Sequence, residues 1–398
     1  MKRLRTVSTR RLLAIVGAVA LLALTAGIAQ GALSGGNPTP DPKPLDRAVV
    51  DALNAPKVDG LTASVTFDNH LIPAGSLPEG STSPLLSGAK GRLWVTNDGR
   101  FRVELQSDAG DAQIVSDGKQ VTVFDANSNT VYRFDAPQGK DKGGADRHKH
   151  GPVTLAQVDK AIAEISKHWS LSGADPTSTA GEPTYTVRIS PRDDGGLLGA
   201  AELAFDAGNG IPLRAAVYAD NQKEPVLELK ADDVSFAAVS HSDLSVTPPA
   251  NARVVDMSSR QQRTHDRHGK PSEIEGPDAV QSKVDFKLAA PASVAGLPRQ
   301  GVRLARHGDE SGAVVVYGKG LGAIAVIEQK AGKQGQRRGG GDRDEQLRLP
   351  QVNIDGATGD ELATGLGTVI TFERDGVAYT VAGSVPPQAA EQVARELR

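Results

Sequence analysis

The stretch GRLWVTNDGRFRVELQSDAGDAQIVSDGKQVTVF, residues 91–124, indicates the fold of this chain more directly than any other. Apolar and polar residues alternate from Phe101 to Gln106, and Val121–Val123 repeats the alternation. Turn-forming residues separate these runs at Asn97–Gly99 and Asp117–Gly118. A period of two indicates strands with one buried face, and closely spaced turns join such strands into hairpins. The stretch therefore predicts an antiparallel meander with one solvated face.

Helical spacing of apolar residues appears on both sides of this meander. One helix is predicted over Leu45–Asn54 and a second over Thr154–Trp169, where Thr154 and Gln157 are spaced as a capping box. Alternating runs then resume between Tyr185 and Phe236. We therefore predict that residues 45–255 form an α+β domain, in which a large curved antiparallel sheet is lidded by helices.

The N-terminus predicts export. Five Lys and Arg residues precede an uncharged run from Leu12 to Ala29, and small residues follow it at Ala29–Ala32. This is the pattern of a signal peptide, and the apolar run is also long enough to span a bilayer. Residues 1–31 are thus either a cleaved signal or an uncleaved membrane anchor, and residues 32–44 form a Pro-rich spacer. Both alternatives place the rest of the chain outside the cytoplasm, secreted or anchored to the cytoplasmic membrane.

The C-terminal part reads as a separate, smaller module. Residues 256–285 are charged and lack apolar periodicity, which predicts an interdomain linker. Residues 286–398 carry several short strand patterns, a Gly- and Arg-rich loop over Lys330–Asp344, and a last amphipathic helix that begins at Pro387. We predict a second α+β module there.

Composition excludes several classes of function. The 398 residues include 45 Lys and Arg against 48 Asp and Glu, a balance that argues against nucleic acid as a partner. Because the chain contains no cysteine, a disulfide framework, a thiolate metal site and a cysteine nucleophile are all excluded.

Five segments carry a resemblance to a known family: Gly91–Val95, Arg100–Val103, Ile114–Lys119, Val123–Asp125 and Asn129–Arg133. In order and spacing they resemble the bacterial LolA-like family of periplasmic outer-membrane lipoprotein carriers, and the RseB/MucB-like periplasmic regulators that share its fold. The likeness is closest to actinobacterial members. It implies an incomplete β-barrel of about eleven strands, lidded by helices, around an apolar cavity for acyl chains.

One departure from the carriers bears on the mechanism. Carriers have Arg-Pro close after the Leu-Trp-Val sequence, and that arginine helps to hold the lid closed. This chain has Asn97 and Asp98 there, with Arg92, Arg100 and Arg102 as possible substitutes. Leu297–Pro298, leading into Tyr317–Leu321, weakly resembles the second domain of the RseB-type regulators.

The resemblance and the apolar stripes together suggest residues for a ligand cavity. These candidates lie in the meander and on the second helix, and a plain hydrophobic core would use the same residue types. They are Trp94, Phe101, Val103, Phe124, Tyr132, Val158, Ile162, Ile165 and Trp169. The second helix, with its single apolar stripe, is the predicted moving lid.

Other motifs favour no catalytic or metal site. His148 and His150 lie among basic residues, Asp342–Glu345 lacks the spacing of a calcium loop, and Gly318–Gly322 joins two apolar runs as a hairpin turn would. We therefore expect no cofactor, no metal and no enzyme. The favoured function is a non-catalytic envelope protein that binds a lipid or lipoprotein acyl chain. The alternative is a regulator that binds a membrane signalling protein of the anti-sigma factor type.

Overall fold

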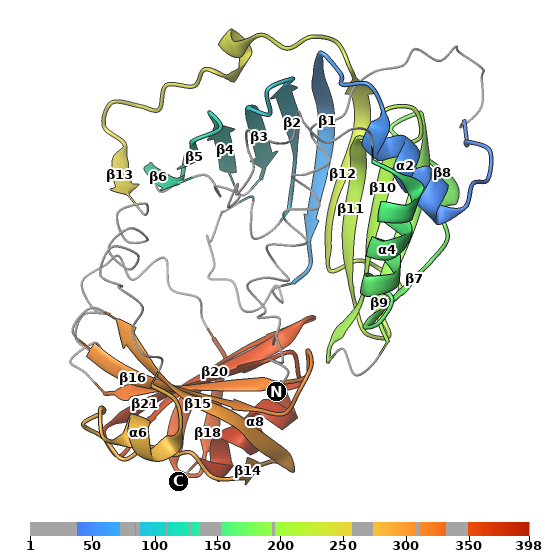
Figure 1. The fold of residues 1–398 in the computed structure, drawn as a ribbon. Coiled ribbons are helices and arrows are strands. Elements are labelled where there is room, and N and C mark those ends of the chain that lie inside the picture. Colours follow the sequence, from blue (N-terminus) through green and yellow to red (C-terminus); the bar gives the residue numbers. More distant parts are fainter. Residues whose placement is uncertain are drawn as a thin grey trace.

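The computed structural model describes residues 38–71, 84, 88–108, 110–127, 129–135, 153–192, 196–256, 274–307, 310–331 and 349–397. In this part of the chain, thirteen strands form one curled sheet in the order β13-β6-β5-β4-β3-β2-β1-β12-β11-β10-β9-β7, and β8 also pairs with β9 (Figure 1). The strands are β1 (Gly60–Asn69), β2 (Ala89–Thr96), β3 (Phe101–Ser107), β4 (Gly110–Ser116), β5 (Gln120–Asp125), β6 (Thr130–Asp135), β7 (Trp169–Leu171), β8 (Asp175–Thr179), β9 (Glu182–Pro191), β10 (Leu198–Asp206), β11 (Pro212–Ala219), β12 (Leu227–Ser235) and β13 (Arg253–Asp256).

The predicted meander is confirmed, because β2 to β6 pair antiparallel in chain order. The sequence did not predict the three short strands β7, β8 and β13. All three lie at the margins of the sheet, and β13 pairs with β6 in the parallel direction. The sheet therefore has more strands than the roughly eleven that the family resemblance implied.

Two longer helices accompany this sheet, α2 (Leu45–Asn54) and α4 (Leu155–Ile165), with a short 3-10 helix, η3 (His241–Leu244), after β12. The capping box is confirmed, since the Gln157 amide donates to the Thr154 hydroxyl and the Gln157 side chain accepts from the Thr154 amide. The predicted extension of α4 to Trp169 is wrong. The helix ends at Ile165, and Trp169 begins β7 because its backbone pairs with Pro191 across the edge of the sheet.

A second sheet of eight strands lies in the C-terminal part, in the order β14-β15-β16-β17-β21-β20-β19-β18. Helices α6 and α8 pack on this sheet, and α6 lies inside the segment predicted as a charged interdomain linker. The elements are α6 (Pro277–Gln281), β14 (Ser293–Val294), β15 (Leu297–His307), β16 (Glu310–Tyr317), β17 (Ile324–Lys330), β18 (Gln351–Ile354), β19 (Ala357–Thr364), β20 (Gly367–Arg374), β21 (Val377–Gly383) and α8 (Pro387–Glu396).

The amphipathic C-terminal helix is confirmed. Ala390, Val393, Ala394 and Leu397 are fully buried and pack on the core face of the second sheet, where Val315, Val326, Ile370 and Val381 are also fully buried. The turn at Gly318–Gly322 joins β16 and β17 as a hairpin, as predicted. The fold is thus α+β, with a large curved sheet, helices, and a smaller sheet with its own helices.

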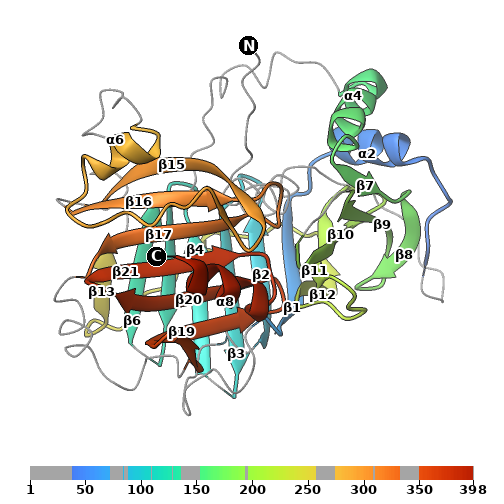
Figure 2. The same ribbon diagram turned by 90° about the horizontal axis from the view of Figure 1, so that it is seen from below.

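The two sheets meet through turns at one end of the first sheet. The Leu197 amide, before β10, donates to the Ser384 hydroxyl at 3.0 Å, after β21. Gly365, in the turn between β19 and β20, lies close to Val226 and Ala219 in the connection of β11 to β12. Both views show α8 on the side of the second sheet that is turned away from the first sheet (Figures 1 and 2).

Several predictions lie outside the described residues. These are the N-terminal signal or anchor, the motif with His148 and His150, the acidic segment Asp342–Glu345, and almost all of the Gly- and Arg-rich loop. Among the residues that the structure does describe, no helix combines the length and the apolar character needed to cross a bilayer.

Candidate functional site

The register of β1 defines two faces of the first sheet. Leu61 and Val65 are buried on one face, whereas Thr62 and Thr66 are half-buried on the other. We call these the apolar face and the polar face. Paired residues in neighbouring strands point to the same side of a sheet. The register therefore assigns each remaining residue of the paired strands to one of the two faces.

One end of the apolar face is filled by a compact core. This core gathers side chains from the start of β1 and from the strands next to it: Val58, Leu61, Ala63, Val65, Val95, Leu105, Ile211, Leu213 and Ala231. All of these are less than a tenth exposed. This part of the face is structural, because it has no room for a ligand without repacking.

Farther along the strands, two neighbouring rows of apolar side chains cross the sheet and are not fully covered. Register pairing aligns Phe67, Leu229, Ala215, Leu203 and Val187 across β1, β12, β11, β10 and β9. The next row is Leu227, Val217, Ala201, Ile189 and Leu171. Nine of the ten side chains are half-buried, Phe67 and Val187 among them packing against the neighbouring cores, and Leu229 is 45% exposed. We call these ten residues the exposed apolar rows.

The helices lie at the β9 end of these rows. Helix α2 buries Ala48 against Tyr185 and Phe205, which share the apolar face with Val187. Helix α4 packs mainly on α2, and two hydrogen bonds tie its start to the end of α2: Asn54 Nδ2 donates to the Val153 carbonyl at 2.8 Å, and the Val153 amide donates to Asn54 Oδ1 at 2.7 Å.

The structure splits the nine cavity residues predicted from the sequence. Phe101, Val103, Tyr132 and Trp169 lie on the apolar face, but Trp94 and Phe124 lie on the polar face, because they pair with Thr62 and Gln113. On α4, Val158 is buried, Ile162 is half-buried and Ile165 is 42% exposed. The meander strands lie toward the β13 edge of the sheet, whereas α4 lies near the β9 edge (Figure 1). The meander residues and the α4 residues therefore do not form one cluster.

Sequence reasoning missed the exposed apolar rows, although a signal was present. Leu227, Leu229 and Ala231 alternate with Glu228 and Lys230, which is the pattern of a strand with one apolar face. The alternation does not indicate whether that face is covered. Only the burial of each residue in the folded sheet distinguishes the filled end from the open rows.

Trp94 on the polar face is enclosed by arginines. The guanidinium of Arg102 lies 5.0 Å from the Trp94 ring centre and that of Arg92 lies 5.9 Å from it, which is cation–π geometry. Arg102 also binds Glu104 and the Asp243 carbonyl, and Arg100 pairs with Asp98. In the described part of the chain, the contacts of these three arginines lie within β2, β3, the turn between them and η3, so they do not hold α2 or α4 in place.

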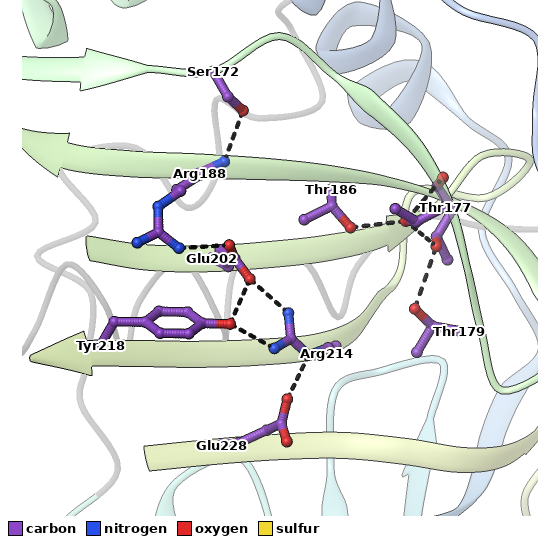
Figure 3. Close-up of polar contacts among 10 residues, drawn as sticks. Ser172, Thr177, Thr179, Thr186, Arg188, Glu202, Arg214, Tyr218 and Glu228 are labelled. Atoms are coloured by element: carbon purple, nitrogen blue, oxygen red, sulfur yellow. Dashed lines mark hydrogen bonds and ion pairs between the residues drawn. The ribbon is translucent and has the colours of Figure 1, made fainter. Parts of the chain in front are cut away.

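A ladder of alternating charges crosses the polar face over β9 to β12 (Figure 3). Arg188 donates to Glu202 at 2.7 Å, Arg214 donates to Glu202 at 2.8 Å, and Arg214 also donates to Glu228 at 2.5 Å. The Tyr218 hydroxyl donates to Glu202 at 2.8 Å. These side chains satisfy one another, so the ladder stabilises the pairing of four strands on the face opposite the exposed apolar rows.

Glu202 and Arg214 both stay charged in this ladder. Burial alone would raise the pKa of Glu202, but hydrogen bonds from Arg214, Tyr218 and Arg188 outweigh burial and lower it. Burial opposes the charge of Arg214 as well, yet its bonds to Glu202, Tyr218 and Glu228 raise its pKa. A carboxylate held in its charged form by three donors is poorly suited to accept a proton in catalysis.

The described residues contain no group of three or more His, Asp and Glu side chains arranged to hold a metal ion. The exposed apolar rows consist of Leu, Val, Ile, Ala and Phe, which offer neither a nucleophile nor an acid or base. What this arrangement can do is bind an apolar molecule.

Comparison with known proteins gives one family match and several similar solved structures. A family described as predicted periplasmic protein (DUF2092) matches residues 77–148, less than a fifth of the chain. No curated protein matches the sequence. The chain is thus similar, over that segment, to proteins described as periplasmic.

Among solved structures, the chain is similar to MucB in complex with MucA(peri), at 17% identity and a TM-score of 0.41, over 89% of this chain and 96% of that one. It is similar to the MucA/MucB complex of Pseudomonas aeruginosa at 15% identity and a TM-score of 0.41, over 88% and 94%. A LolA superfamily protein from Nitrosomonas europaea shares 12% identity with a TM-score of 0.22, over 51% of this chain and 98% of that one.

Proposed function

We propose that this chain is a non-catalytic, exported cell-envelope protein that binds an acyl chain of a lipid or lipoprotein on the apolar face of its first sheet. The observation that carries the proposal is the exposure of Leu229. This residue lies on a central strand, between β1 and β11, and is still 45% exposed. The centre of a large sheet is where a folded protein normally covers its apolar side chains.

The residues around Leu229 define the chemistry of the ligand. Its paired neighbours Phe67 and Ala215, and the adjoining row with Leu227 and Val217, are all apolar and half-buried. Covering such a surface with an alkyl chain is favourable, at about 25 cal/mol per Å² of apolar area removed from water. The backbone groups of these strands already pair within the sheet, so the surface offers little to a polar ligand.

Helix α4 is the proposed lid. It packs mainly on α2 and leaves Ile165 exposed. An alkyl chain that enters beside α4 exchanges the contacts of the half-buried Ile162 for its own contacts, so opening does not transfer the whole apolar stripe to water. With Val158 still buried, the N-terminal turn of α4 remains docked.

Substitution of Leu229 tests the proposed function. Leu229→Glu places a charge in the middle of the exposed apolar rows, and we expect it to weaken binding of a fluorescent fatty acid by about tenfold or more, since each buried methylene contributes about 0.8 kcal/mol. The matched control is Lys90→Glu, an exposed residue on the polar face. Native mass spectrometry of the purified chain should show bound lipid. Equal affinity of wild type and Leu229→Glu, or no binding by the wild type, contradicts the proposal.

The second candidate function is regulatory binding to a membrane signalling protein of the anti-sigma factor type. It is favoured by one observation, the second sheet with a fully buried core of its own, which a carrier with one binding face does not require. Crosslinking in membranes followed by mass spectrometry tests it. Recovery of a membrane protein attached to the second sheet supports this candidate, and recovery of lipid alone counts against it.

A further inference from the structure

Part of the second sheet is apolar on both of its faces. Its core face carries Val315, Val326, Val381 and Ile370, which are fully buried under α8. On the opposite face, register pairing aligns Val316, Ala325, Ala382, Val369 and Leu362 in one row across β16, β17, β21, β20 and β19. We call these five residues the outer row. Strands that are apolar on both sides normally lie between two covering layers.

The outer row is nevertheless not fully covered. All of its side chains are at least partly exposed, and Val369, on a central strand, is 36% exposed. Val314 and Ile327 pair with each other in the adjoining row and are also only half-buried. Helices α6 and α8 pack against the core face, so within the described residues neither helix covers the outer row.

The outer row borders the place where the two sheets meet. Leu362 and Val369 flank the turn that contains Gly365, and that turn contacts Val226 and Ala219 of the first sheet. Ala382 lies two residues before Ser384, which accepts a hydrogen bond from the Leu197 amide. Both views show α8 on the side of the second sheet that is turned away from the first sheet (Figures 1 and 2). Because α8 packs on the core face, the face that carries the outer row is the one on the side of the first sheet. Leu227 and Val217, in the exposed apolar rows, lie next to the same contact.

The chemistry of this surface favours an alkyl chain over a polypeptide. A peptide laid on the face of a sheet would bury backbone N–H and C=O groups, each of which needs a hydrogen-bond partner. The backbone groups of the central strands are already paired within the sheet and offer a peptide no partners. The nearest side-chain hydroxyls are those of Thr371 and Thr380, which continue the adjoining row of Val314 and Ile327. An alkyl chain has no polar group to satisfy and gains from every covered side chain.

We propose that the outer row binds a second acyl chain of the ligand whose first acyl chain lies on the exposed apolar rows of the first sheet. This inference rests on the proposed function and makes the ligand a lipid with at least two acyl chains. The exposed apolar rows and the outer row both border the contact between the two sheets at Gly365. A lipid headgroup near Gly365 would therefore let one acyl chain lie on each sheet. A row across five strands is about 19 Å long, because neighbouring strands are about 4.8 Å apart.

Unique cysteines test the proposal, because the chain has none of its own. Leu229→Cys, Val369→Cys and the control Gln388→Cys, exposed on α8, are each labelled with a fluorophore in the full chain. The probe is a phosphatidylcholine with a nitroxide quencher on one acyl chain. We expect loss of fluorescence at positions 229 and 369 and none at 388.

The outcomes separate the two proposals. Quenching at position 229 without quenching at 369 overturns the second-chain inference and leaves the proposed function intact, whereas quenching at neither position overturns both. A second measurement uses Val369→Glu, whose partly exposed site tolerates a charge. We expect about tenfold weaker binding of the two-chain lipid and affinity for a single-chain fatty acid within about twofold of wild type. Equal loss for both ligands contradicts the inference.

Discussion

Glu328 is the least expected residue of the second sheet, because its carboxyl group lies in a hydrophobic core. The residue is fully buried on the core face of β17, beside Tyr379 of β21. Its Oε2 accepts a hydrogen bond from the Ala289 amide at 2.8 Å, while among the described residues neither Oε1 nor the buried Tyr317 hydroxyl has a hydrogen-bond partner. Burial raises the pKa of Glu328 to about 7, despite the hydrogen bond from Ala289.

This residue makes stability depend on pH. Because burial raises the pKa of Glu328 above its ordinary value of 4.5, the folded chain binds a proton more tightly than the unfolded chain. Stability is therefore expected to fall as pH rises from about 4.5 to about 7, by roughly 3 kcal/mol, and to level off above that range. Glu328→Gln keeps an acceptor for Ala289 and should remove this slope. Urea unfolding at pH 5 and pH 8 measures the free energy of unfolding of wild type and of Glu328→Gln. The same pH dependence of this free energy in the two proteins would refute the prediction.

At the scale of elements, the two ends of α4 are held to the rest of the protein to different degrees. Its start is determined locally by the capping box of Thr154 and Gln157 and by the bonds between Asn54 and Val153. Its end carries Ile165, which is 42% exposed, and the chain then turns into β7. An element docked firmly at one end and weakly at the other is suited to open locally.

We expect the amides at the end of α4 to exchange hydrogen faster than those of Phe101–Leu105 in β3, which pair on both sides. Ile162→Asp should loosen α4 and weaken fatty-acid binding several-fold, since the half-buried side chain contributes roughly 1–2 kcal/mol of packing. Lys160→Asp, on an exposed position, is the control. Exchange in α4 as slow as in β3 would identify it as a static core helix and not a lid.

At the scale of the whole molecule, turns make the contact between the two sheets. The hydrophobic core of each sheet lies apart from this contact. One core gathers around Leu61 and Val65 in the first sheet, and the other gathers around Ile370 and Val393 in the second. Gly365 contributes to the contact because it has no side chain: a Cβ atom there would lie 2.9 Å from Val226 Cγ1. The two sheets are therefore expected to fold independently and to keep their relative position through a few close contacts.

Gly365→Val should separate the sheets without unfolding either one. The added side chain must displace Val226, so we expect a larger radius of gyration by small-angle X-ray scattering and an unchanged circular dichroism spectrum. Gly301→Ala is the control, because a Cβ atom at Gly301 meets nothing within 4 Å. Loss of secondary structure in Gly365→Val would show instead that the contact is part of one common core.

The sequence by itself determined the elements whose signals lie within a few residues. The alternation in residues 91–124 produced the meander, the Thr154–Gln157 box set the start of α4, and the apolar side of the last helix is the side that is buried. In each case the interacting residues are neighbours in the chain, so period and capping chemistry suffice. The family resemblance added the helix-lidded curved sheet.

Only the tertiary structure decided which face each strand residue occupies and which apolar residues stay open. Trp94 and Phe101 have the same aromatic character in the sequence, but pairing with Thr62 places Trp94 on the polar face, whereas Phe101 pairs with Val95 on the apolar face. Those pairings join distant segments; Thr66 and Asp232, for example, are 166 residues apart and hydrogen-bonded. A period of two specifies that a strand has two faces, and long-range register specifies what each face contacts.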